Sequence, residues 1–134
     1  MEDPRPAFNR YLEALASHDI EALRRCIDPD FESINRLRPS RSFQGRETFL
    51  DAWARNWELV PGLHTEVGRT AVTDDHIWFE SRRLRGDDSV MACGVNIVRI
   101  EGGRFRQSTT YIDSPVEDGE TLGEWAERQR RSGQ

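Results

Sequence analysis

The 134-residue chain contains no lysine, because all 19 of its basic residues are arginine. This absence excludes chemistry that needs a lysine amine, such as Schiff-base formation, a pyridoxal phosphate site or the lysine of a phosphate-binding P-loop. The chain also lacks an apolar run near the roughly 18 residues of a membrane span, and its start lacks the basic and apolar segments of a secretory signal. We therefore expect a cytoplasmic protein that does not bind membranes.

Metal-binding patterns are absent as well. The two cysteines, Cys26 and Cys93, lie far apart, and the three histidines, His18, His64 and His76, show no ligand spacing. One distant cysteine pair forms neither a disulfide framework nor a zinc motif, so we interpret both as small buried residues in a reducing compartment. The sequence predicts no metal and no cofactor.

The composition supports one folded core. Hydrophobic residues make up 36% of the chain and charged residues 32%, and the four Trp and six Phe are too many for a disordered chain. The length is that of one domain. The net charge of −5 argues against nucleic acid as a partner, because phosphate binding depends on positive potential.

The first half of the chain has apolar residues at helical spacing. This periodicity predicts helices over residues 5–17, 20–27 and 46–59, with Asp19 as the cap of the second. Between the second and third helices we expect a turn at 28–30, a short strand at 31–35 and a loop at 36–44.

The second half has the alternation and turn residues of a meander. We expect strands at 63–73, 76–85, 89–101 and 104–113, followed by a short amphipathic helix at 121–131. Helices followed by strands favour the α+β class, with helices on one side of a mostly antiparallel sheet.

Three segments carry a family resemblance: FNRYLEALASHDIEALRRCIDPDFE, GRETFLDAW and VNIVRIEGGRFRQSTTYID. In this order they resemble the SnoaL-like branch of the nuclear transport factor 2-like superfamily, over about residues 6–113. The resemblance implies a single domain across residues 1–134, with a tail or short helix at 114–134. It also implies a cone-shaped barrel, in which a strongly curved mixed or antiparallel sheet wraps around about three helices and encloses one deep pocket.

The resemblance assigns three catalytic candidates. Tyr11 matches the tyrosine that donates to the oxyanion in the family's ketosteroid isomerases. Asn35 falls where those enzymes carry an aspartate base and where limonene epoxide hydrolases hold the attacking water with an asparagine. Asn96 falls at the second oxyanion donor, and its apolar strand neighbours mean that its amide needs a partner.

The later strands supply further candidates. Thr110 falls where cyclases and epoxide hydrolases place an acid, and Ser108 shares its face. Ser81 and Arg83 match a charged pair of the epoxide hydrolases, and an inward Arg83 would bind a carboxylate or enolate. The opposite register would turn Glu80 and Arg82 inward instead.

A second question of register concerns Asp113. The alternation turns Asp113 away from the pocket, whereas a slip of one residue would make it the obvious acid.

Aromatic side chains that line the pocket would pack against a flat ligand, and we expect this role for Trp53, Trp57 and Phe79.

The strand at 89–101 is apolar on both faces, since Met91, Cys93, Val95 and Ile97 alternate with the inward residues. Strands apolar on both faces are buried on both. In the family this pattern goes with dimers packed sheet to sheet, so we expect a homodimer through the convex sheet face.

These observations lead to a functional hypothesis. We expect a cofactor-independent enzyme that acts on a hydrophobic, carbonyl-bearing small molecule by cyclisation, isomerisation, dehydration or hydrolysis, in bacterial secondary metabolism. The alternative is a dimeric ligand carrier or protein-interaction module that lacks the family's catalytic acids. An ionisable group facing the pocket would favour the enzyme, and an all-neutral pocket would favour the carrier.

The missing metal motifs and phosphate loop generate a first prediction. Protein purified without added metal should contain less than stoichiometric metal by elemental analysis and should show no absorbing cofactor, because no ligand set with the required spacing is present. One zinc per chain would contradict it.

Overall fold

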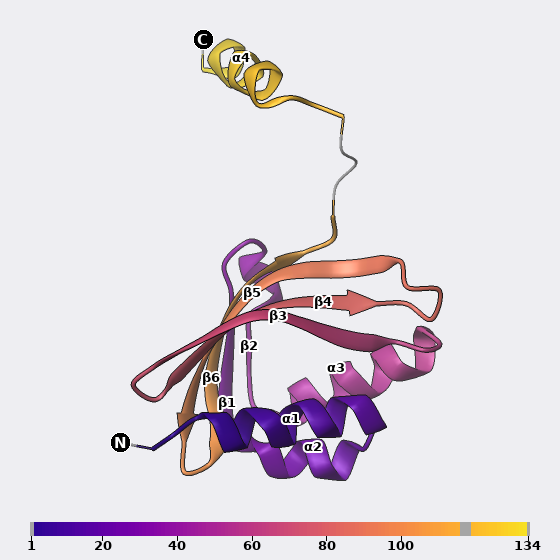
Figure 1. The fold of residues 1–134 in the computed structure, drawn as a ribbon, viewed down its shortest axis with the longest axis vertical. Helices are drawn as coiled ribbons and strands as arrows, with labels where there is room; N and C mark the ends of the chain where they lie inside the picture. The colour runs from indigo at the N-terminus through magenta and orange to yellow at the C-terminus, as the bar shows by residue number, and fades with distance from the viewer. Residues whose placement is uncertain (1, 116–118, 134) are drawn as a thin grey trace.

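The computed structural model describes residues 2–115 and 119–133 (Figure 1). Within these residues four α-helices and six strands follow one another, together with a 3₁₀ turn, η1. The elements are α1 (Arg5–Ser17), α2 (Ile20–Cys26), β1 (Ile27–Asn35), η1 (Pro39–Arg41), β2 (Phe43–Gln44), α3 (Arg46–Leu59), β3 (His64–Thr73), β4 (His76–Leu84), β5 (Val90–Glu101), β6 (Arg104–Asp113) and α4 (Leu122–Ser132). The α+β class is therefore confirmed.

The helices begin and end where local chemistry favours it. The backbone of His18 turns left-handed at φ 53° and ends α1, and its N–H donates to Ala14 and Leu15. The side chain of Asp19 then caps α2 by accepting the N–H of Ala22 at 3.0 Å. The observed bounds lie within one residue of the predicted ones for all four helices.

The six strands form one mixed sheet in the order β2-β1-β6-β5-β4-β3. Strands β3 to β6 are joined by antiparallel hairpins, as predicted, whereas β1 pairs parallel to β6. Figure 1 shows the sheet bending over α1, α2 and α3, which lie together on one side of it. The sheet is strongly curved but open, because β2 and β3 form separate edges.

The turn predicted at residues 28–30 is instead part of β1. The register against β6 shifts between Ile27 and Glu32, so these residues form an irregular, bulged stretch of strand. The predicted turn chemistry is still present, since the Asp28 carboxylate accepts the N–H of Asp30 at 2.8 Å. The loop predicted at 36–44 contains η1 and the short β2.

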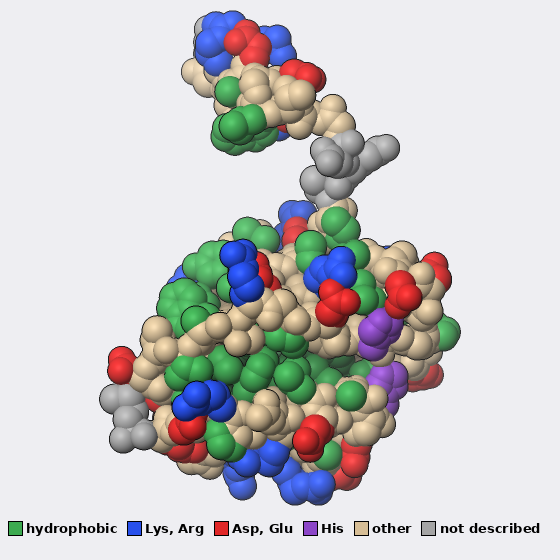
Figure 2. Space-filling model, viewed as in Figure 1, with side chains coloured by type: hydrophobic (Ala, Val, Ile, Leu, Met, Phe, Trp, Pro, Cys, Tyr) green, Lys and Arg blue, Asp and Glu red, His purple; other side chains and the backbone are tan. Residues whose placement is uncertain are grey.

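The core lies between the helices and the concave face of the sheet. Phe8 of α1 packs on Phe79 of β4 with ring centroids 4.7 Å apart, and Leu23, Ile27 and Phe31 are almost fully buried. By contrast α4 exposes Leu122 and Trp125. Figure 2 shows apolar side chains on one side of α4 and charged ones on the other, as its sequence predicts.

Gly94 is the point at which β5 approaches the β6 backbone most closely. Its φ of 154° is unusual for residues with a side chain, and an added Cβ would lie 1.9 Å from the carbonyl oxygen of Tyr111. A larger residue here would therefore force the two central strands apart.

This contact predicts that Gly94→Ala lowers the free energy of unfolding by about 2–5 kcal/mol, from backbone strain and overpacking together. Urea titration followed by tryptophan fluorescence measures the change. Gly123→Ala is the matched control, because Gly123 lies in α4 and has no close neighbour to clash with. Equal unfolding midpoints for Gly94→Ala and the native protein would contradict the role of Gly94.

Candidate functional site

A cavity of about 440 Å³ opens between the concave face of the sheet and helices α1 and α3. Its apolar wall is rich in aromatic side chains, namely Phe31, Phe43, Phe49, Trp53, Phe79 and Phe105. Its polar wall consists of Tyr11, Ser33, Asn35, Asn56, Asn96, Ser108, Thr110 and Ser114, and its charged groups are Arg41, Arg83 and Asp113. Polar or charged side chains thus make up about half of the lining residues, and an aromatic wall that faces polar groups is typical of small-molecule sites.

Most of the predicted site residues line this cavity. They are Tyr11, Asn35, Trp53, Phe79, Arg83, Asn96, Ser108 and Thr110. Trp57 does not, because its ring stacks on His18 at a centroid distance of 4.8 Å and belongs to the contact between α1 and α3. The structure therefore places Trp57 outside the wall of this cavity.

The register of β4 decides between the two arginines considered above. Arg83 lines the cavity, whereas Arg82 points outward and pairs with Glu66 at 2.5 Å. Glu80 also points outward, and hydrogen bonds from Arg69 lower the pKa of its carboxyl to about 2. Glu80 is thus an ionised surface group and not a cavity acid.

Asn96 has the buried partner that its apolar strand requires. Its amide nitrogen donates to the hydroxyl of Ser81 at 2.8 Å, and both residues are buried. Ser81, predicted to bind a ligand, is not among the residues that line this cavity, and its hydroxyl holds the Asn96 side chain in place. An amide nitrogen carries two N–H groups, so Asn96 keeps a second donor and its carbonyl oxygen for a ligand.

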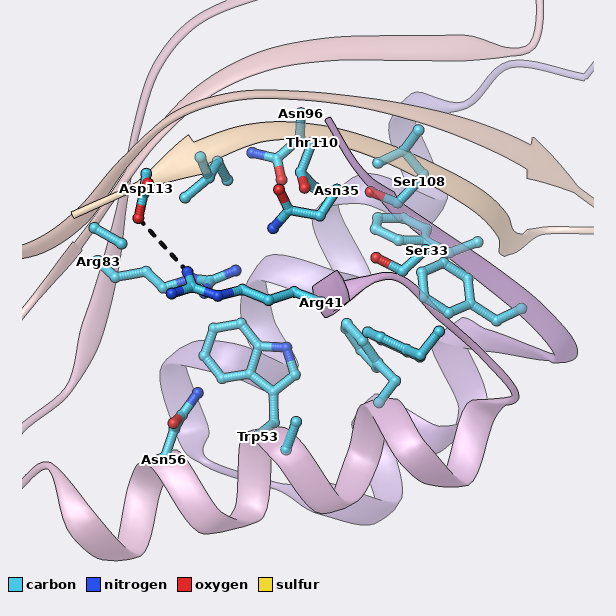
Figure 3. Close-up of a pocket in the computed structure, with 18 of the residues that line it drawn as sticks. Ser33, Asn35, Arg41, Trp53, Asn56, Arg83, Asn96, Ser108, Thr110 and Asp113 are labelled. Atoms are coloured by element: carbon cyan, nitrogen blue, oxygen red, sulfur yellow. Dashed lines mark ion pairs between the residues drawn. The ribbon is translucent and has the colours of Figure 1, made fainter. Parts of the chain in front are cut away.

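Asn35, Thr110 and Asn96 form a row across three adjacent strands. Asn35 of β1 and Asn96 of β5 are both register partners of Thr110 in β6. Figure 3 shows the three side chains gathered on one wall of the cavity. The side-chain oxygen Oδ1 of Asn35 accepts the backbone N–H of Arg38 at 2.8 Å, which leaves the side-chain amide nitrogen of Asn35 free to donate.

Arg83 is half-buried in the cavity wall, and its guanidinium stands 4.9 Å from the ring centroid of Trp53. Burial lowers the pKa of Arg83, although an arginine remains protonated at any working pH. Burial also raises the pKa of the neighbouring Tyr11 to about 12, so its phenol remains a neutral donor. Tyr11 is held in place by Phe105, whose ring centroid lies 4.5 Å away.

Asp113 lines the cavity, contrary to the expectation from strict alternation. It is the last residue of β6, and the chain leaves the sheet at Ser114, so the alternation ends there. The pKa of Asp113 is lowered, first by the N–H of Ser114 and then by Arg38 and Arg41, whose nitrogens lie 2.8 and 3.5 Å from its oxygens. Figure 3 marks the pair with Arg41.

Sequence reasoning missed several further lining residues. Asn56 stands three residues after Trp53 on the same helical face, and Ser33 alternates with Asn35 along β1, so both carried a periodic signal. Arg41 lies in η1, where no periodicity applies.

Across residues 2–115 and 119–133, no group of three or more His, Cys, Asp or Glu side chains could hold a metal ion. In the same ranges, no helix has the length and apolar character needed to cross a membrane.

Comparison with solved structures shows which folds this one resembles. An NTF2-like protein of unknown function from Mesorhizobium loti matches with a TM-score of 0.67 at 21% identity, covering 85% of this chain and 97% of that one. A putative polyketide cyclase from Sinorhizobium meliloti matches with 0.66 at 18% identity, over 78% and 93%. A putative ketosteroid isomerase from Kribbella flavida matches with 0.70 at 16% identity, over 88% and 83%.

At these identities the structural matches show the fold alone. Comparison with curated proteins finds no relative that matches. The model of the SnoaL-like domain, however, matches residues 8–108, which is well over half of the chain. The chain therefore belongs to the SnoaL-like family.

Proposed function

We propose that this protein is a cofactor-independent enzyme that polarises the carbonyl of a hydrophobic small molecule and isomerises or cyclises it through an enolate. The observation that carries the proposal is the row of Asn35, Thr110 and Asn96 on one wall of a cavity whose apolar wall is rich in aromatic side chains. Amide donors in a water-poor site stabilise negative charge on a substrate oxygen more strongly than water does. Two proteins of the same fold, the putative polyketide cyclase and the putative ketosteroid isomerase named above, are consistent with this class of reaction.

The proposed steps need one base and one oxyanion site. The substrate's α-carbon gives up a proton, and the electrons of the broken C–H bond move to the carbonyl oxygen, which accepts hydrogen bonds from Asn35 and Asn96. Asp113 is the one carboxylate among the described residues of the wall, so we assign it as the acceptor of the proton. Return of that proton to another carbon of a conjugated enolate gives an isomer. Attack by the enolate carbon on a second carbonyl closes a ring and moves the electron pair of that C=O bond to its oxygen, which takes the proton back from Asp113.

The alternative is a ligand carrier without catalysis. An all-neutral cavity would favour it, whereas Arg83 and Asp113 both reach this cavity. Charged groups in an apolar pocket are costly to keep there and are typical of catalytic sites. Their presence favours the enzyme over the carrier.

The proposal predicts that the native protein speeds exchange of the α-protons of a flat ketone, such as β-tetralone, in D₂O. Mass spectrometry or proton NMR measures this exchange without knowledge of the natural product. Asn96→Leu should slow it about 10²-fold, because one oxyanion donor is lost. The fold should survive, since only the Ser81 hydroxyl is left unpaired, at a cost of roughly 1–3 kcal/mol.

Two variants sharpen this experiment. Glu80→Gln, on the outer face of the same sheet, should leave the exchange rate unchanged. Asn96→Asp restores the residue type of the isomerases and tests whether an acid at this position raises the rate. Exchange no faster than in buffer, or equal rates for the native protein and Asn96→Leu, would refute the mechanism.

We also propose that two copies pack through the convex face of the sheet. Trp78 and Tyr111 are 42% and 44% exposed there, beside the partly buried Val95 and Ile97. Met91, expected on this face, lines the cavity instead, because the β4–β5 register shifts next to it. Exposed aromatic side chains on a sheet face are typical of an interface.

The dimer predicts a sedimentation mass of about twice 15.5 kDa at micromolar concentration. Trp78→Arg should shift the protein to the monomer, because it places an unpaired charge within the apolar contact. Leu59→Arg is the control, since Leu59 is even more exposed, at 64%, but ends α3, away from this face. A monomeric native protein would rule out the dimer.

A further inference from the structure

Arg83 is the one feature of the cavity that the proposed chemistry leaves unexplained. The other charged groups of the wall pair with each other, since Asp113 lies within 4 Å of both Arg38 and Arg41. Among the described residues, no carboxylate forms such a pair with Arg83, and the one ionisable group that influences its pKa is the neutral phenol of Tyr11. The cavity wall thus carries two arginines and one aspartate, a net charge of +1, in a chain whose net charge is −5.

A half-buried guanidinium without a counter-ion weakens the fold. Its desolvation is unfavourable, and the contact with Trp53 at 4.9 Å recovers only part of that loss. An apolar side chain of similar size at this position would fill the same space without the charge. Stability alone therefore does not account for Arg83, and a ligand that supplies the missing negative charge does.

The surroundings of Arg83 restrict what that ligand can be. The guanidinium of Arg83 lies over the indole of Trp53, and among the described residues none accepts a hydrogen bond from it, so its N–H groups can donate to a ligand. Those N–H groups match the two oxygens of a carboxylate. A single cation balances a monoanion, whereas a phosphate dianion would need further donors at the same place. Phe49, whose ring centroid lies 6.4 Å from that of Trp53, adds a second aromatic ring to this wall, and Phe79 adds another from the sheet.

We infer that the substrate is a flat, hydrophobic carboxylic acid whose carboxylate binds Arg83 while its ring system lies along Trp53 and the phenylalanines. The opposite end of such a molecule then reaches the row formed by Asn35, Thr110 and Asn96, where the reacting carbonyl binds. The inference rests on the proposed function in taking this cavity as the substrate site. It adds the substrate class and gives Arg83 the role of an anchor.

A pair of probes of equal shape tests the inference. β-Naphthoate carries the carboxylate, and β-naphthamide replaces it with a neutral amide. Isothermal titration calorimetry, with tryptophan fluorescence as a second readout, should show that the native protein binds the naphthoate at least 10-fold more tightly. A bidentate charged contact of this kind is worth about 10- to 100-fold in affinity.

Two arginine variants separate an anchor from a structural residue. Arg83→Met should abolish the preference for the naphthoate, while its unfolding midpoint in urea stays equal to or above that of the native protein. Arg82→Met, next to it on the outer face of β4, should keep the preference. Should Arg83→Met fail to fold, Arg83→Lys replaces it as the test. Lysine keeps the positive charge but lacks the two parallel N–H donors of the guanidinium, so it should keep a reduced preference for the naphthoate.

The outcomes distinguish this inference from the proposed function. Equal affinity for both probes, no binding of either, or a preference that survives in Arg83→Met would overturn the carboxylate anchor. None of these outcomes bears on the exchange of α-protons from a neutral ketone. Conversely, a preference that depends on Arg83 together with no catalysed exchange would support the anchor and refute the enolate mechanism.

Discussion

The parallel pairing of β1 with β6 is the contact on which the rest of the structure depends. It joins residues 27–35 to residues 105–110, and so links the helical first half of the chain to the hairpins of the second half. Without it, the antiparallel meander would be a sheet without helices on its concave face. Because α2 leads directly into β1 and α3 follows β2, this pairing also positions both helices against the sheet. The cavity exists because the sheet then bends over them.

The sheet separates two electrostatic environments that are one side chain apart. On the outer face of β4, Glu80 and Arg82 are exposed and bind Arg69 and Glu66, in pairs that contribute little to stability. On the inner face Arg83 has no such partner and lies among aromatic rings. A charge on the outer face is therefore screened by water. The same charge on the inner face interacts more strongly with its neighbours, because the effective dielectric constant falls inside the protein.

The polar groups of the cavity differ from the catalytic acids that the family resemblance implies at the same positions. Asn35, Asn96 and Thr110 stand where the resemblance implies acids, so this wall of the cavity presents neutral polar groups. The carboxylate of the wall is Asp113, at the end of β6 and held by two arginines of the segment around η1. The pocket is therefore asymmetric. It has neutral polar groups on one wall, the cation of Arg83 beside Trp53, and the paired carboxylate of Asp113 at the end of β6. Such a pocket binds a substrate in one orientation.

The sequence by itself determined the elements and part of the cavity wall. The helix bounds follow from apolar spacing and from the cap at Asp19, and the alternation along β5 and β6 correctly turned Asn96, Ser108 and Thr110 inward. These features are local, since each depends on residues within a few positions of one another.

Only the tertiary structure decided features that depend on contacts between distant segments. The partner of Asn96 is Ser81 on another strand, and Trp57 is removed from the cavity by its contact with His18. Asp113 reaches the cavity because the sheet ends there and arginines from residues 38–41 bind it. Periodicity records which way a side chain points relative to its own backbone. It contains no information on which side chain of another segment will lie opposite, because that depends on how the sheet bends and where its strands end.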